Sequence, residues 1–420
     1  MWIDSICIIQ DDTDDWASES AKMSDIYRNC LVVLAADASN NPEGGLFNQK
    51  STFQDEEPFG EHVVLIVKLF GGQRIGLCVS HEKEAIIEKE LRKSTLNSRA
   101  WTLQESILAP RILHFTSRQL IWECQKGFQG EDMFQHQLGR SHTQPFPAIK
   151  LYLEREQKGL VPLLKTWYHL VVEKYSKRHL TISEDKLPAL SGLAQIAAAA
   201  LKSRYVAGMW ELHLEWALCW ICLGSKSLRS QNRCPSFSWA SRNGQVEWCI
   251  YLHGFSATVK IHEISVEPES CDAYGRVIAG GWLQVSGYVS AAPRAFDSLD
   301  VDDSSNECAL ADLVGPEAAL REGTLVDLAD SHMYLDDTPS HGHLDNLFTL
   351  EVGIGTDLLA TLGGMDDNYG TYVGLLLLEP IAGVSDSFRR VGFGYLGDAR
   401  AATKLSIYRQ SCHCRTIKIY

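Results

Sequence analysis

Residues 96–124 read LNSRAWTLQESILAPRILHFTSRQLIWEC and predict one helix followed by two strands. At 100° per residue, the apolar side chains of the first half form one stripe, which predicts a helix over residues 98–109 with Ser98 as N-cap and Pro110 as its end. The runs RILHFT and QLIWECQ, separated by residues 117 and 118, predict a β-hairpin. This stretch therefore closes a domain of mixed helix and strand near residue 130.

The residues before this stretch extend the same pattern. WIDSICIIQ, residues 2–10, is a short apolar run closed by the acidic turn DDTDD and predicts a strand. Residues 13–29 have helical spacing, and LVVLAAD at 31–37 predicts a second strand. A strand, helix and strand of this length indicate a parallel βαβ unit in a doubly wound α/β layer. Residues 62–80, HVVLIVKLF-GGQ-RIGLCVS, predict a further hairpin.

The pattern changes twice further along the chain. Residues 145–232 carry long helical periodicities and predict some three helices, the last of them over AGMWELHLEWALCWICL. Residues 235–420 consist mainly of short apolar runs such as FSWAS, KIHEISV and YVGLLLLEP, which predict a sandwich or barrel-like β domain. We expect three parts: an α/β domain over 1–135, a helical segment over 145–232 and a β-rich domain of unknown role over 235–420.

Composition excludes several classes of protein. The 39 Lys and Arg against 53 Asp and Glu give a formal charge of −14, which would repel phosphate backbones and argues against nucleic-acid partners. No window reaches the roughly 18 uninterrupted apolar residues that a membrane span requires, and no basic region opens a signal peptide. We expect a cytoplasmic protein whose cysteines are mostly buried free thiols.

One candidate site lies at the predicted first strand. Asp4 falls inside this strand and Gln10 at its carboxyl end, the edge at which open α/β sheets bind ligands. Because a buried carboxylate is costly without a charged partner, we expect Asp4 to pair with Arg99. Acids that merely cap the next helix are the alternative.

A second candidate lies on the helix that follows. Trp101, Gln104 and Glu105 share one flank and could present an amide and a carboxylate to a ligand stacked on the indole. Partial burial would raise the pKa of the carboxyl group toward that of a useful general acid or base. A solvated helix face is the alternative.

Other patterns do not predict a metal or cofactor. Cys219 and Cys222 have redox spacing in CWIC, but the run is apolar, so we expect reduced, metal-free thiols buried in a helix. The cluster SHMYLDDTPSHGH at 331–343 favours a polar loop over a metal site. No phosphate loop, dinucleotide motif or nucleophile elbow is present.

Two stretches of the chain, residues 2–30 and 96–124, resemble the second and third blocks of the fungal heterokaryon incompatibility (HET) domain. The resemblance is specific over about residues 1–125, and DKLPALSGLA, YVAGMWE, CPSFSWAS and RRVGFG show a weaker similarity to the region downstream of many such domains. The matching positions are Trp2, Ile3, Asp4, Cys7, Ile8, Gln10, Arg99, Trp101, Thr102, Gln104, Glu105, Trp122, Glu123 and Cys124.

This resemblance implies a role in fungal non-self recognition, as a cell-death effector or signalling module that acts through protein contacts. It also implies a TIR-like, doubly wound fold, and TIR domains signal through homotypic assembly. The family's first block is expected before Trp2, so the resemblance implies a truncated α/β domain. Because some TIR domains cleave NAD, the alternative is an enzyme that cleaves NAD or a related nucleotide, with Glu105 as catalytic carboxylate, Asp4 and Arg99 in support and Trp101 as stacking platform.

Overall fold

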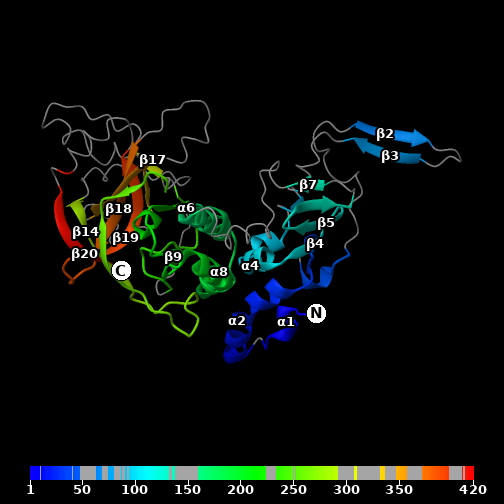
Figure 1. The fold of residues 1–420 in the computed structure, drawn as a ribbon, viewed down its shortest axis with the longest axis horizontal. Helices are drawn as coiled ribbons and strands as arrows, with labels where there is room; N and C mark the ends of the chain where they lie inside the picture. Colours follow the sequence, from blue (N-terminus) through cyan, green and yellow to red (C-terminus); the bar gives the residue numbers. More distant parts are fainter. Residues whose placement is uncertain are drawn as a thin grey trace. The chain divides into compact units, whose positions relative to one another are not determined.

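The computed structural model describes most of the chain as two compact units, residues 1–152 and 153–420 (Figure 1). The described residues are 1–9, 11–39, 41–47, 63–68, 74–79, 87, 90–91, 94–131, 135–137, 159–223, 233–248, 250, 252–291, 307–309, 332–335, 347–356, 371–396, 409 and 412–420. The structure has mixed helix and strand content, with a β-rich C-terminal region. No helix among these residues is both long and apolar enough to cross a membrane.

The first unit combines short helices with a mixed sheet. Its elements are α1 (Asp4–Cys7), α2 (Thr13–Asn29), β1 (Val33–Ala35), η1 (Pro42–Gly44), β2 (Val63–Lys68), β3 (Arg74–Val79), η2 (Leu96–Ser98), α4 (Trp101–Leu108), β4 (Arg111–Phe115), β5 (Leu120–Cys124), β6 (Gly127–Gly130) and β7 (Gln135–Gln137). Helix α2, strand β1 and both predicted hairpins are therefore confirmed.

The predicted strand over residues 2–10 is wrong, because Asp4–Cys7 forms the short helix α1. A strand needs a neighbour to satisfy its backbone, whereas here the Cys7 N–H donates locally to the Ile3 carbonyl over 2.8 Å. The Asp4 carboxylate also accepts the backbone N–H of Ser5 over 2.7 Å. Such local side-chain bonds compete with sheet pairing at the start of the chain. Ile6 is 76% exposed, so these residues do not bury an apolar face as a core strand would.

Strands β1, β4, β5, β6 and β7 form one sheet in that order. In the described part of this sheet β1 and β4 run parallel, and the pairs from β4 to β7 are antiparallel. A parallel doubly wound layer is thus not confirmed. Helix α4 begins at Trp101 and not at Ser98, because residues 96–98 form the 3-10 turn η2. Helix α4 buries Leu103, Ile107 and Leu108 and leads directly into β4.

The second unit starts with helices and continues with short strands. Its first elements are α6 (Leu160–Lys165), the π-helical turn η4 (Thr166–Val172), α7 (Glu173–Ser176), η5 (Ser183–Lys186), η6 (Pro188–Leu190), α8 (Ser191–Leu201), β8 (Tyr205–Val206), β9 (Met209–Trp210), α9 (Leu214–Ala217), β10 (Trp220–Leu223), η7 (Trp239–Ser241) and β11 (Gln245–Trp248).

The predicted helix through CWIC is wrong, although both of its thiols are free and buried as expected. Cys222 lies in β10, which pairs antiparallel with β11, and Cys219 lies between α9 and β10. The residues of this run are buried on every side, so their apolar character carries no periodicity that separates helix from strand. FSWAS forms the 3-10 turn η7 in place of a strand, since the Ser238 hydroxyl accepts the Ala240 N–H and caps the turn.

Indole groups fix the hairpin between β8 and β9. The Gly208 carbonyl accepts hydrogen bonds from Trp167 Nε1 at 3.2 Å and from Trp239 Nε1 at 2.9 Å. Gly208 has a φ of +94°, and a Cβ there would lie 2.8 Å from Trp239 Nε1. Only glycine therefore fits between the turn and the two buried tryptophans.

The remaining strands are β12 (Ser256–Ala257), β13 (Lys260–Ser265), β14 (Trp282–Ala291), β15 (Glu307–Ala309), β16 (His332–Leu335), β17 (Phe348–Thr356), β18 (Thr371–Pro380), β19 (Ser387–Leu396) and β20 (His413–Ile419). The pairings β17–β14, β14–β20, β20–β19, β19–β18 and β18–β17 close on themselves, which gives the barrel-like arrangement. Residues 332–335 of the predicted loop at 331–343 form the strand β16. The residues 336–343, which contain the remaining possible metal ligands of this stretch, lie outside the described residues.

A buried arginine joins this ring of strands to the helical part of the second unit. Arg390 of β19 donates to the Leu218 carbonyl over 2.6 Å and stacks on the Trp220 ring at 3.4 Å. The guanidinium is fully buried, so its bonds to carbonyl groups offset the loss of water. We call the closed set of strands β14, β17, β18, β19 and β20 the β-ring. Residues 218–220 and the β-ring therefore share one core.

Replacement of Gly208 tests this core. Gly208→Ala should destabilise the second unit by roughly 2–5 kcal/mol. The new Cβ strains the backbone at a positive φ and also clashes with Trp239. Gly254→Ala is the matched control, since Gly254 also has a positive φ of +83° but has open space at its Cβ position. That variant should cost only about 1–2 kcal/mol. Equal shifts in the urea midpoints of the two variants would contradict the packing argument.

Candidate functional site

Two of the predicted site residues come together around a tyrosine. The Tyr27 hydroxyl, on α2, donates to the carboxylate of Glu105 on α4, and the charge of Asp4 on α1 acts on the same hydroxyl. Burial, followed by the negative charge of Glu105, holds the pKa of Tyr27 well above its ordinary value. The phenol therefore stays protonated and remains a donor. Helices α2 and α4 pack against each other, which places the pair.

Two tryptophans lie near the residues of this hydrogen bond, one in space and one along α4. The Trp2 ring meets the Tyr27 ring edge-on, with 5.7 Å between centroids. The indole Nε1 of Trp2 is buried and has no hydrogen-bond partner among the described residues. Trp101 lies one helical turn before Glu105 and is half-buried. We call Trp2, Asp4, Tyr27, Trp101 and Glu105 the acidic-aromatic cluster.

The expected burial of an Asp4–Arg99 pair is wrong. Asp4 is exposed in the first turn of α1, and Arg99 is exposed at the residue after η2. The expectation depended on a carboxylate enclosed in a strand, and α1 removes that enclosure. A contact between two exposed side chains is screened by water and contributes about 0–1 kcal/mol.

The other predicted site residues have different environments. Thr102 and Gln104 are buried, and the Thr102 hydroxyl donates to the Arg99 carbonyl over 2.8 Å. Thr102 therefore holds the turn that leads into α4. Cys7 is exposed on α1, and Gln10 lies outside the described residues.

Sequence reasoning missed a buried cluster of charged groups in the sheet. His114 on β4 contacts Asp37 through Nδ1 at 2.8 Å and Glu123 on β5 through Nε2 at 2.7 Å. All three side chains are buried, and Glu123 is 0% exposed. We call these three residues the histidine clamp, because they link the residues after β1 to β4 and β5.

The clamp favours the charged form of His114. Burial alone would lower the pKa of this imidazole, but the hydrogen bonds to Asp37 and Glu123 and their negative charges raise it to about 9. Both ring nitrogens thus carry protons at neutral pH and both are engaged. Because all three residues are buried, and the most exposed of them, Asp37, is only 7% exposed, the clamp suits a structural role and not substrate binding.

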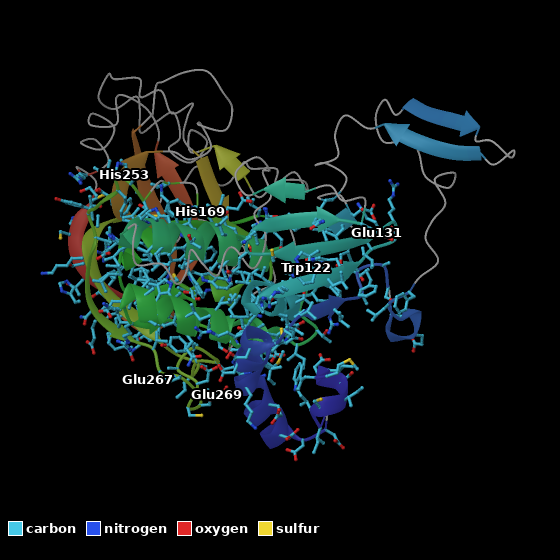
Figure 2. All side chains as sticks on the ribbon, turned by 45° about the vertical axis from the view of Figure 1, so that its right-hand side comes forward. Trp122, Glu131, His169, His253, Glu267 and Glu269 are labelled. Carbon is cyan, nitrogen blue, oxygen red and sulfur yellow. The ribbon has the colours of Figure 1, made fainter. Side chains whose placement is uncertain are left out.

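A signal for the clamp does exist in the sequence. In RILHF, His114 lies two residues after Ile112 and shares its buried face. In LIWEC, Glu123 lies two residues after Ile121 and shares its buried face in the same way. Trp122, labelled in Figure 2, lies on the other side of β5 and is half-buried. Ionisable residues in register with buried isoleucines predict a buried charge pair. The third member, Asp37, follows β1 and could not be assigned without the β1–β4 pairing.

The second unit encloses a lysine in aromatic surroundings. Lys186 is 3% exposed, and its Nζ lies 5.9 Å from the Tyr175 ring centre and 5.7 Å from that of Trp239. Burial, followed by the charge of Arg233, lowers the pKa of Lys186 to about 7. Within the described residues, no group of three or more His, Cys, Asp or Glu is arranged to hold a metal ion.

The clamp should make stability depend on alkaline pH. Because the folded pKa of His114 lies above the unfolded value of about 6.5, its contribution is complete below pH 6.5 and is lost as the pH rises through about 9. Over this pH range the free energy of unfolding of the first unit should fall by on the order of 3 kcal/mol. The fall is measured as a lower urea midpoint. His114→Gln should lower the midpoint at pH 6.5 and flatten the pH dependence. If the urea midpoint of His114→Gln fell with pH as steeply as that of the unsubstituted protein, a charged His114 would be contradicted.

Residues 1–105 match the family model described as heterokaryon incompatibility protein (HET). The match covers α1, α2, β1, the β2–β3 hairpin and α4 as far as Glu105. Residues 1–105 are thus similar to the HET family, which confirms the resemblance found in the sequence over this range. The comparisons with curated proteins and with solved structures gave no match.

Proposed function

We propose that this protein is a cytoplasmic effector of heterokaryon incompatibility, which signals or causes cell death through protein contacts of its first unit. The observation that carries the proposal is the match of residues 1–105 to the HET family. A distant relation to TIR domains is part of the proposal. In its support, β1 and β4 are parallel neighbours in the sheet, and α4 precedes β4 directly in the chain, as the helix of a βαβ unit precedes its second strand.

The surface of the first unit suits contacts with other proteins. Ile6 on α1 is 76% exposed, Leu31 is 78% exposed and Leu34 on β1 is 45% exposed. Each of these exposed apolar side chains is available for contact with a partner protein. The half-buried Trp101 adds an aromatic anchor of the kind that dominates binding energy at interfaces.

The proposal predicts opposite outcomes for two neighbouring substitutions. In the full chain expressed in a fungal host, Trp101→Ala should abolish killing. The loss of an aromatic anchor weakens the binding free energy of an interface by about 2 kcal/mol or more. Glu105→Gln is nearly isosteric and should leave killing mostly intact. Trp122→Ala is the matched control, since it removes another half-buried indole from the same unit. Killing that persists in Trp101→Ala, or that is lost equally in Trp122→Ala, would contradict a specific anchor.

The second candidate is a TIR-like enzyme that cleaves NAD or a related nucleotide. The acidic-aromatic cluster favours it, since the Glu105 carboxylate accepts a hydrogen bond from Tyr27, whose ring meets the Trp2 indole edge-on. The buried indole N–H of Trp2, with no partner among the described residues, adds a donor next to this pair. Glu105 would act as the carboxylate that assists bond cleavage, with Tyr27 fixing its orientation.

An assay with purified full-length protein and NAD separates the two candidates. If the enzyme reading holds, Glu105→Gln should lower the cleavage rate by roughly 10²–10⁴-fold while the fold persists. Tyr27→Phe should move the acidic limb of the pH–rate profile to higher pH, because a hydrogen bond to the charged carboxylate is lost. No cleavage above that of buffer, or cleavage unaffected by Glu105→Gln, would exclude the enzyme reading.

A further inference from the structure

Lys186 is buried in the second unit without an acceptor for its side-chain nitrogen. The residue is 3% exposed, and no described residue accepts a hydrogen bond from its Nζ. This atom lies over two aromatic rings, 5.9 Å from the centre of Tyr175 and 5.7 Å from that of Trp239. The Tyr175 hydroxyl donates to the Lys186 carbonyl over 2.7 Å, which fixes the tyrosine beside this residue. A lysine in such a place holds either a poorly solvated charge or a neutral, reactive amine.

Hydrogen bonds place Arg233 next to this lysine, because they join it to the turns that carry Lys186 and Trp239. Its Nη1 donates over 2.7 Å to the carbonyl of Ser183, the first residue of the turn η5 that ends at Lys186. Its Nε donates over 2.7 Å to the carbonyl of Ala240, which follows Trp239 in η7. Arg233 is 7% exposed, and its charge acts on Lys186. Two buried basic side chains are therefore neighbours.

Neither Lys186 nor Arg233 has a carboxylate partner among the described residues. The hydrogen bonds of the guanidinium all end on neutral oxygens, namely the carbonyls of Ser183, Ala240 and Arg242 and the side-chain amide of Asn243. Since a guanidinium has five N–H groups and these bonds use four of them, one donor is left.

The acidic residues of the same turn do not supply the missing negative charge. The buried carboxylate of Asp185 is already paired with Arg276 at 2.9 Å. The charge of Glu184 acts on Arg233, but this residue is exposed to water. An anion formed at Lys186 would therefore find both an unbalanced positive charge and an unused donor on Arg233.

We propose that Lys186 is a carboxylation site, where carbon dioxide adds to the side-chain amine and the resulting carbamate pairs with Arg233. The lone pair of the neutral amine attacks the carbon of CO2 and forms a C–N bond. One C=O π bond breaks, and its electron pair moves to the oxygen. The nitrogen then releases one proton, so Lys186 carries a negative charge. A carbamate is planar like a carboxylate and matches the geometry of a guanidinium.

The surroundings of Lys186 favour this reaction. Burial, followed by the charge of Arg233, lowers the pKa of its amine to about 7, so about half of it is neutral at pH 7. At the ordinary pKa of 10.5 the neutral fraction is smaller by a factor on the order of 10³. The buried thiols of Cys222 and Cys234 also act on this lysine, and burial raises the pKa of Cys234 to about 12, which leaves it uncharged. Carbon dioxide has no charge to desolvate when it enters an aromatic environment.

Carbon-13 NMR of the full chain in 13C-labelled bicarbonate, which supplies dissolved CO2, tests the proposal. We expect a carbamate carbon signal that disappears in Lys186→Met, a variant that keeps an apolar stem of similar length without the amine. Lys22→Met is the matched control, because Lys22 is exposed and its hydrogen bond to Glu19 raises the pKa of its amine. The signal should persist in that variant.

The urea midpoint of the second unit provides a readout that needs no substitution. The unfolded chain gives Lys186 an ordinary pKa and no partner, so carbamate forms mainly in the folded state. Bicarbonate should therefore raise the midpoint relative to chloride at the same pH and ionic strength. Lys186→Met should show no such rise.

Three results would overturn the proposal: no carbamate signal, a signal that persists in Lys186→Met, or an equal midpoint rise in that variant and the unsubstituted chain. If Lys186→Met folds poorly, the carbamate is trapped in the unsubstituted chain with an alkylating oxonium salt and its position is mapped by mass spectrometry of peptides. An adduct on Lys186 supports the site, and adducts confined to other amines contradict it.

Discussion

The first unit depends on the burial of a positive charge between two negative ones. His114, Asp37 and Glu123 would each be costly to remove from water alone, but both nitrogens of the imidazole contact a carboxylate at 2.7–2.8 Å. The clamp ties the short strand β1 to β4 and β5. Since β1 has only three residues, its backbone pairing with β4 is a weak support without the clamp. Removing one partner would leave a buried charge uncompensated, so the clamp holds this part of the sheet together with the apolar cluster of Ala35, Ala109 and Ile112.

The position of the acidic-aromatic cluster follows from this frame. Helix α4 ends at Leu108, and Ala109 and Pro110 connect it to the start of β4, so the strand fixes the end of the helix. Ala109 packs with Ala35 of β1 and Ile112 of β4 in one apolar cluster. Glu105 projects from the same helix toward Tyr27 on α2. The buried clamp thus supports, through β4 and α4, the residues of the acidic-aromatic cluster.

Sequence patterns predicted the elements that have a clear period or turn. The β4–β5 hairpin and α2 follow from alternation and helical spacing, and Glu105 and Asp4 were singled out from residue chemistry. Tyr27 was not, because its role depends on the packing of α2 against α4, which no local pattern contains. The strand predicted around Asp4 was wrong because local hydrogen bonds replaced a pairing that the apolar residues alone suggested.

The second unit shows a different limit. Residues 216–222 are all buried, so this apolar run has no exposed side from which to read a period. The turn at Gly208 is fixed by indoles from residues 167 and 239, which are far apart in the chain. The β-ring was predicted as a class, since the C-terminal sequence carries successive apolar runs typical of strands. The closure of its pairings depends on long-range register.

Hydrogen–deuterium exchange measured by mass spectrometry on His114→Gln tests most directly whether the clamp supports the cluster. If the clamp supports the cluster, β1, β4, β5 and also α4 should exchange faster than in the unsubstituted protein. The second unit should be unchanged and serves as an internal reference. Loss of protection confined to the three strands, with α4 exchanging as in the unsubstituted protein, would contradict the claim that the buried charges hold Glu105 and Trp101 in place.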